Sequence, residues 1–356
     1  MQTVFKGKKV TAMLAVLPEN EYFFDDEVNN YDFPVKQTLR LKKVMGFNKH
    51  RLSKETSTAS DFALYGLNYM LENNWIKKDD IGALIVASLC PDHFVPHISN
   101  IVQGKAGLSD DVLCMDIPQG CCGFLLGLSQ AFMLLEHIQD KKIVLVNVDI
   151  LSHKISKRDR NDFPLIGDGA AFSIIENSSD SADIYYEMHM DGSRGEALII
   201  PAGGFRMPCS EKTAIMENTG DGNYRSLDNM HMDGSAVFNF VQTEVPPMLE
   251  HTFEQSGYGI GDIDYFLFHQ PNKFMLQKLA EKVGIPQEKM PMELVENYGN
   301  TSGSSIPIIT VHSIGDKLRN NNFQCCLSAF GSGLAWGAMI MELGKLDNCE
   351  MIVSNL

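Results

Sequence analysis

The sequence lacks long apolar runs, a leader-like N-terminus and an excess of positive charge. No run of apolar residues reaches the roughly 18 residues that a membrane-spanning helix needs, and the first residues lack the apolar run of a secretory signal. The 45 Asp and Glu outnumber the 30 Lys and Arg, which gives a net charge of −15. So acidic a chain is unsuited to general binding of nucleic acid or anionic membranes. These absences predict a cytoplasmic protein with no membrane span and no nucleic-acid partner.

The cysteines lack the paired spacing of a metal site. Most of the 8 cysteines lie in apolar, strand-like runs, so we expect reduced thiols. His93 and His97 stand four residues apart, but no third ligand of a suitable kind is near them in the sequence. We therefore assign both histidines to the surface or to a dimer interface, and we predict no bound metal.

The composition is that of an ordinary globular protein, with 44% hydrophobic and 21% charged residues. Predicted strands and helices alternate along the chain, which indicates an α/β fold. The chain also contains an internal duplication, because residues 78–88 resemble residues 260–270. Each half closes with a late apolar strand. The polar run that begins at Asn177 has turn composition and is the expected linker between the halves.

One cysteine stands where a predicted strand stops and a predicted helix starts. Residues 111–117 form a short apolar run, and residues 124–135 carry a dense helical apolar pattern. Cys121 and Cys122 therefore lie at or just before the first helical turn. The free N–H groups and partial positive charge of a helix N-terminus stabilise a thiolate, so we expect a lowered cysteine pKa and a nucleophile. Two small buried residues in a tight turn would give the same pattern.

Three further signals lie in the second half of the chain. An apolar strand ends in His269, Asn300 precedes a predicted helix, and two glycines flank Ser332 after another strand. Each signal is weak by itself. A histidine at a strand end is more often structural than catalytic, and an asparagine before a helix is usually a cap.

Taken in order, the motifs resemble those of the β-ketoacyl-acyl-carrier-protein synthase III group of the thiolase superfamily. The resemblance runs from Val10 to about Leu343. It is carried by Asp116-Ile-Pro-Gln-Gly-Cys-Cys-Gly-Phe, Ile166-Gly-Asp-Gly-Ala-Ala, His269-Gln-Pro-Asn, Gly299-Asn-Thr-Ser and Ala329-Phe-Gly-Ser-Gly-Leu-Ala-Trp-Gly. It implies a thiolase-like, duplicated five-layer αβαβα architecture. Residues 1–177 would form the half with the cysteine, and residues 178–356 the half with the histidine and the asparagine.

The resemblance also implies a decarboxylating Claisen condensation. An acyl group from an acyl thioester would be loaded on Cys121, with Cys122 as the alternative one residue away, and then joined to malonyl-acyl carrier protein. The product would enter fatty-acid or specialised lipid or metabolite biosynthesis. His269 and Asn300 would stabilise the enolate, and the backbone N–H groups of Cys121 and Ser332 would form the oxyanion hole. No metal or organic cofactor is needed, because the substrates carry the activating groups.

The substrate and its carrier would meet four further residues. Members of the group that use coenzyme A hold its adenine between an aromatic residue and an arginine. Alignment puts Arg40 at the aromatic position and Arg160 at the arginine position. We therefore expect the first acyl donor to be carrier-bound or an unusual coenzyme A ester. Phe330 would contact the substrate, Lys273 would guide an acidic acyl carrier protein, and the resemblance implies a homodimer.

Other functions remain open from the sequence. The chain would also fit a non-catalytic or acyl-transferring partner subunit of a heterodimeric condensing enzyme. Head-to-head acyl condensation, or formation of a hydroxymethylglutaryl-type product, would need a carboxylate base near the cysteine, for which Asp92 is the one candidate. The Cys-His-Asn set by itself would also fit a thiol hydrolase.

Overall fold

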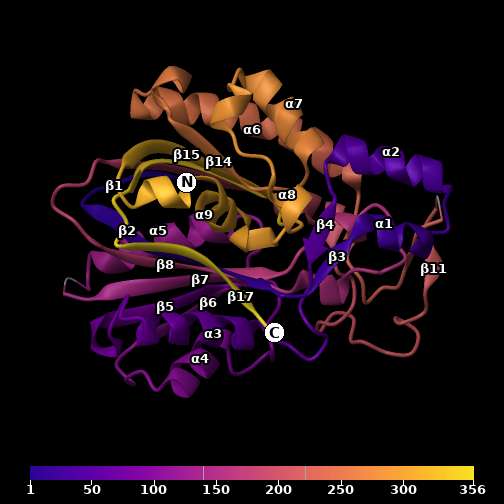
Figure 1. Cartoon of the computed structure of the whole chain (residues 1–356), viewed down its shortest axis with the longest axis horizontal. Coiled ribbons are helices and arrows are strands. Elements are labelled where there is room, and N and C mark those ends of the chain that lie inside the picture. Colours follow the sequence, from indigo (N-terminus) through magenta and orange to yellow (C-terminus); the bar gives the residue numbers. More distant parts are fainter. Residues whose placement is uncertain (139, 221) are drawn as a thin grey trace.

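The structure is a computed structural model that describes residues 1–138, 140–220 and 222–356. Two mixed β-sheets lie face to face, with helices between them and on both outer faces (Figure 1). The first sheet has the order β17 (Asn348–Ser354), β2 (Lys8–Pro18), β8 (Gly169–Asn177), β7 (Lys142–Asp149), β5 (Ile81–Ala87) and β6 (Leu113–Ile117). The second has the order β1 (Gln2–Phe5), β9 (Ile184–Met190), β16 (Ala335–Gly344), β15 (Asn322–Gly331) and β14 (Tyr265–Phe268).

Three pairs of helices complete the five layers. The outer face of the first sheet is covered by α3 (Ala59–Glu72) and α4 (Ile98–Ala106). The helices α6 (Gly234–Ser256) and α7 (Lys273–Val283) cover the outer face of the second sheet. The central pair, α5 (Gly123–Leu135) and α9 (Ser305–Leu318), contacts both sheets. This arrangement confirms the predicted thiolase-like layering.

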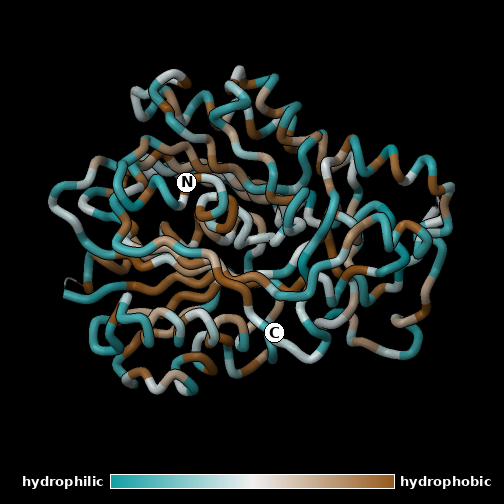
Figure 2. The backbone as a smooth tube through the Cα atoms, viewed as in Figure 1, coloured by the Kyte–Doolittle hydropathy of each residue, from teal (hydrophilic) through white to brown (hydrophobic). Residues whose placement is uncertain are grey.

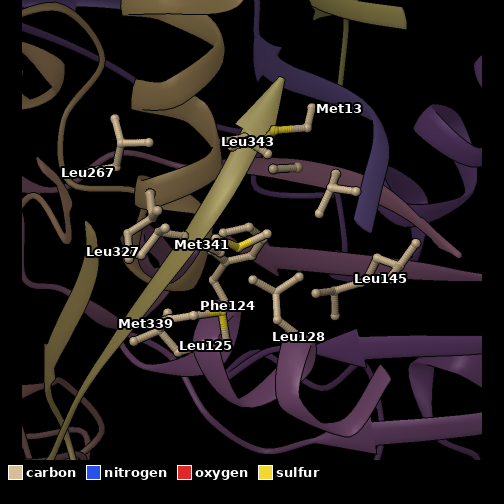
Figure 3. Packing of buried hydrophobic residues seen from close by; sticks show 14 of the residues in the cluster. Met13, Phe124, Leu125, Leu128, Leu145, Leu267, Leu327, Met339, Met341 and Leu343 are labelled. Carbon is tan, nitrogen blue, oxygen red and sulfur yellow. The ribbon is translucent and has the colours of Figure 1, made fainter. Parts of the chain in front are cut away.

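The central layer is apolar on every side. Phe124, Leu125 and Leu128 of α5 pack between Leu145 of β7 and the methionines of β16 (Figure 3). A helix with apolar residues all round its surface is stable when it is buried from every direction. The hydropathy colouring agrees, because brown segments concentrate in the sheets and teal segments lie on the periphery (Figure 2). The observed helix α5 confirms the prediction for residues 124–135.

The duplication appears in the strand pairing. β5 and β7 are parallel neighbours in the first sheet, and β14 and β15 are parallel neighbours in the second. The two terminal strands each join the sheet of the other half. The N-terminal strand β1 pairs with β9 in the second sheet, and the C-terminal strand β17 pairs with β2 in the first. The division at residue 177 stays a prediction, and this exchange of termini ties the two sheets together.

A smaller layer of short elements closes one end of the sheets (Figure 1). Its core joins Phe24, Phe47 and Phe163. It contains α1 (Phe24–Glu27), α2 (Val35–Met45), α8 (Leu294–Asn297), β3 (Glu21–Phe23), β4 (Lys49–Arg51), β10 (Leu198–Ile199), β11 (Glu217–Asn218), β12 (Tyr224–Arg225) and β13 (His231–Met232). None of the helices in the described ranges has both the length and the apolarity to cross a membrane.

Candidate active site

Cys121 lies in the turn between β6 and α5, two residues before the helix begins. The turn is tight, because the Gly123 N–H donates to the Gly120 carbonyl at 2.5 Å. The two cysteines face different surroundings. Cys121 lines an internal cavity of about 310 Å³. Cys122 is fully buried, and its thiol donates to the Ala335 carbonyl at 3.4 Å.

The cavity brings together the three residues that the sequence singled out from separate segments. Cys121, His269 and Asn300 all line it. The rest of its wall is mostly apolar and comes from both halves of the chain: Leu89, Leu151, Ile166, Leu198, Ile199, Ile200, Met230, Met232, Val237, Pro271, Met275, Ser302, Phe330, Gly331 and Ser332. An apolar cavity with a few convergent polar groups is typical of an active site.

His269 is held as a buried, neutral ring. Its Nδ1 lies 2.7 Å from the Ser305 Oγ, and its ring packs edge-on against Phe330 with the centroids 5.8 Å apart. Burial lowers the pKa of His269 from 6.5 to about 3, against a smaller effect of a hydrogen bond to the Ser302 backbone. The imidazole is therefore uncharged at neutral pH, and it is suited to donating a hydrogen bond rather than to acting as a charged acid.

The Asn300 side chain is oriented by the turn that follows it. Its Oδ1 accepts from the Ser302 N–H at 2.9 Å, so the amide NH₂ is left to act on a ligand in the cavity. The Asn300 backbone pairs with the first half, because its N–H donates to Leu165 and its carbonyl accepts from Gly167. A Cβ on Gly167 would lie 2.1 Å from the Tyr298 carbonyl, so this close approach requires glycine. The Gly167-Asp-Gly segment is thus a structural loop.

Two backbone N–H groups act on the Cys121 sulfur. The N–H groups of Ser332 and of Cys121 itself, together with the Ser332 hydroxyl, lower the pKa of the thiol. The Gln119 side chain donates to the Ser332 carbonyl at 2.9 Å and fixes the turn that carries it. Gly331 leaves no space beside the sulfur, since a Cβ there would lie 2.4 Å from the Cys121 Sγ.

The expectation of a lowered cysteine pKa is wrong. Burial raises the pKa of the Cys121 thiol, and the negative charge of Asp149 adds to this, while the Ser332 hydrogen bonds oppose it. Burial in the cavity destabilises the thiolate more than the N-terminus of α5 stabilises it. The resting side chain is therefore the neutral thiol at neutral pH.

A second cavity of about 530 Å³ continues toward the surface and shares Met230, Pro271 and Asn300 with the first. Near its wall, the Arg160 guanidinium stacks on the ring of Phe33, with the guanidinium carbon 3.6 Å from the ring centroid. The sequence alignment had put Arg40 opposite Arg160. Arg40 is exposed on α2 and lines neither cavity, so the aromatic partner of Arg160 is Phe33.

Basic residues gather in a groove beside this outer cavity. Lys273, the first residue of α7, lines the groove with Lys42 and Lys43 of α2. Val44 lines both the groove and the outer cavity. Glu296 also lines the groove and pairs with Lys273 at 3.5 Å, and Lys42 pairs with Asp25 at 2.8 Å. The three lysines still leave the groove with a net positive charge beside the path that leads to Cys121.

Sequence reasoning missed several residues of the site. Ser305 and Phe33 carried no sequence signal, because their importance depends on partners far away in the chain. Asp149 did carry one, since it is an acidic residue at the end of a mostly apolar strand.

Family models match segments in both halves of the chain. A family model described as 3-oxoacyl-[acyl-carrier-protein (ACP)] synthase III matches residues 115–192, and one described as its C-terminal part matches residues 253–343. A β-ketoacyl-[acyl-carrier-protein] synthase III of Streptococcus sanguinis is 32% identical over 298 residues, which are 83% of this chain and 87% of that protein. One of Lactococcus lactis is 29% identical and covers 94% of this chain and 99% of that protein.

Solved structures give the same result. The crystal structure of a 3-oxoacyl-(acyl-carrier protein) synthase of Burkholderia xenovorans superposes with a TM-score of 0.91 at 28% identity. The superposition covers 99% of each chain. The similarity therefore includes both sheets, the central helices and the smaller layer at their end.

Proposed function

The chain belongs to the β-ketoacyl-acyl-carrier-protein synthase III family, and on that basis we propose that Cys121, His269 and Asn300 carry out its decarboxylating Claisen condensation. The observation that carries this assignment is that the three side chains line one largely apolar cavity although they come from separate segments. Water-poor surroundings strengthen every hydrogen bond to a developing charge.

In the first step, the Cys121 sulfur attacks the carbonyl carbon of an acyl thioester. A new C–S bond forms, the old one breaks, and the departing thiol takes up the proton that Cys121 gives up. The N–H groups of Cys121 and Ser332, which meet at the sulfur, are suited to stabilising the oxyanion of the intermediate. Cys122 is an unsuitable nucleophile, because its thiol is engaged by the Ala335 carbonyl in the core.

In the second step, a malonyl thioester loses carbon dioxide. The electron pair of the broken C–C bond moves into an enolate, whose oxygen would accept hydrogen bonds from neutral His269 and from the Asn300 amide. The carbanion carbon then attacks the acyl-cysteine carbonyl. A C–C bond forms, and the Cys121 sulfur leaves and regains a proton. His269 and the Asn300 amide both stay neutral between pH 5 and 9. This suits a step in which they donate hydrogen bonds and neither of them gains a proton.

The first acyl donor is a carrier-bound thioester in this proposal. An adenine ring stacked between Phe33 and Arg160 would need about 3.5 Å on each face, or about 7 Å in total. The two groups are 3.6 Å apart, so the pair is closed to a purine. The groove lined by Lys42, Lys43 and Lys273 is instead suited to the acidic surface and phosphate of an acyl carrier protein.

We also propose a homodimer that acts in the cytoplasm. Phe94, Val95 and Phe205 are 62%, 76% and 90% exposed, and the two phenylalanine rings stack with centroids 5.1 Å apart. Exposed large apolar residues of this kind are typical of a protein interface. His93 and His97 are exposed on the same loop. A second copy of the chain would cover this surface.

Intact-mass spectrometry tests the assignment directly. The protein is mixed with matched acyl-coenzyme A and acyl-carrier-protein thioesters, and Cys121→Ser is compared with Cys122→Ser. We expect a single acyl adduct that forms faster from the carrier and is lost in Cys121→Ser alone. An adduct that survives in Cys121→Ser would move the nucleophile elsewhere. Faster labelling by acetyl-coenzyme A would refute the carrier-bound donor, and no labelling by any thioester would refute the proposed nucleophile.

A further inference from the structure

Asp149 is a buried carboxylate near Cys121 that the proposed reaction does not use. It is the last residue of β7, and its surface is fully buried. The ion pairs formed by residues 1–138, 140–220 and 222–356 do not include it. A buried charge needs hydrogen bonds in place of solvent. Its partners therefore indicate what it holds in place.

The partners of Asp149 come from both halves of the chain. Its Oδ1 accepts from the Leu89 N–H at 2.7 Å and from the Ser88 hydroxyl at 3.4 Å. Its Oδ2 accepts from the Gly303 N–H at 3.1 Å, in the turn that directly follows Ser302. Leu89 and Ser302 line the cavity around Cys121. One carboxylate thus joins two walls of the active-site cavity.

Gly303 lies between this carboxylate and the turn that carries the nucleophile. A Cβ on Gly303 would lie 3.3 Å from the Asp149 Oδ2 and 2.8 Å from the carbonyl of Gly120, the residue before Cys121. The Gly303 turn is therefore packed closely against both the Asp149 carboxylate and the residue before Cys121. A shift of the Gly303 turn would move Gly120 and Cys121 with it.

Few titratable groups face Cys121 and Asp149. Asp149, His269 and the Cys122 thiol are the titratable groups that face Cys121, and the Cys90 thiol also faces Asp149. Burial raises the pKa of Asp149 to about 6, so it is ionised at pH 7.5. The negative charge of Asp149 disfavours a second negative charge on the Cys121 sulfur.

We propose that Asp149 is a positioning residue that fixes the Leu89 loop and the Ser302–Gly303 turn against the nucleophile turn, and that its negative charge makes the Cys121 thiol harder to ionise. The inference rests on the proposed function in taking Cys121 as the nucleophile. It assigns Asp149 two effects of opposite sign. Removing the charge makes the thiol easier to ionise, while loosening the two loops makes condensation slower.

The test is Asp149→Asn, which keeps the size of the side chain but removes its charge and one acceptor. We measure the rate at which iodoacetamide alkylates Cys121 across pH, with the modified peptide identified by mass spectrometry. The midpoint should fall by about one pH unit. Condensation with malonyl-acyl carrier protein, started from enzyme already acylated on Cys121, should slow by about tenfold or more.

Ser88→Ala is the matched control, because it removes one hydrogen bond to Asp149 and leaves the charge in place. Its alkylation midpoint should equal that of the wild type. An unchanged or higher alkylation midpoint in Asp149→Asn would overturn the proposal, and so would a condensation rate within twofold of wild type. New alkylation of buried Cys122 would also overturn it, because it would mean that the site has opened. Alkylation needs no acyl substrate, so a wild type that no thioester acylates would instead count against the proposed function.

Discussion

Replacing Gly331 by alanine should inactivate the enzyme without unfolding it. The Cβ of the new residue would lie 2.4 Å from the Cys121 Sγ and 2.7 Å from the Cys121 Cβ. Non-bonded carbon and sulfur atoms need at least about 3.5 Å, so the sulfur and the turn must separate by roughly 1 Å. Gly331 ends the packed strand β15, and Cys121 lies in the tight turn before α5, so neither backbone is free to move away.

The size of the effect follows from this displacement. A misplacement of about 1 Å costs on the order of 100-fold in rate, because the attacking atom leaves its line to the carbonyl and to the oxyanion donors. Overpacking a site of this kind costs about 1–3 kcal/mol in the free energy of unfolding. Gly331→Ala should therefore remain folded, and its acylation should be slower by about two orders of magnitude. The assay is the time course of acyl-adduct formation by intact-mass spectrometry.

Gly104→Ala is the matched control. Gly104 lies within α4, and a Cβ there meets nothing within 4 Å. The control should gain about 1 kcal/mol of stability from helix propensity and keep its acylation rate within twofold. Acylation of folded Gly331→Ala within threefold of the wild-type rate would refute the argument that glycine is required beside the sulfur.

Four further outcomes are expected. His269→Ala and Asn300→Ala should each slow condensation of pre-acylated enzyme by about 100-fold while self-acylation persists; equal loss of both steps in stopped-quench assays would contradict their role as enolate donors. His269→Gln should reduce the dependence of the unfolding free energy on pH, measured with urea. The native pKa of His269 is about 3 against an ordinary 6.5, so the unfolded chain binds the extra proton between these values. Stability therefore falls as pH drops from 6.5 toward 3, and the variant should lose about 1.4 kcal/mol per pH unit of that slope; an unchanged slope would mean that the native ring is charged. Phe33→Ala should raise the rate of labelling by acyl-coenzyme A relative to acyl carrier protein, and a constant ratio would show that the closed Phe33–Arg160 pair does not select the donor. Phe205→Asp should give a monomer in light scattering after size exclusion, whereas an intact dimer would place the interface elsewhere.

Much of the candidate site was predictable because it depends on contiguous segments. The change from strand to helix around Cys121 is a local pattern, and α5 begins within one residue of the predicted position. His269 and Asn300 are likewise carried by short motifs that follow an apolar strand or precede a helix. The duplication predicted the two sheets, because each repeated segment forms the equivalent parallel strand.

The sequence by itself determined the layered fold, the family and the three residues of the site, since short apolar patterns and ordered motifs encode them. Tertiary structure alone decided which cysteine faces the cavity, because the partner of Cys122 is 213 residues away. It also decided that burial raises the pKa of Cys121, and that Phe33 rather than Arg40 meets Arg160. The burial of a side chain and the identity of its partners depend on segments that are far apart in the sequence and meet only in the folded chain. A local pattern of residues therefore does not predict them.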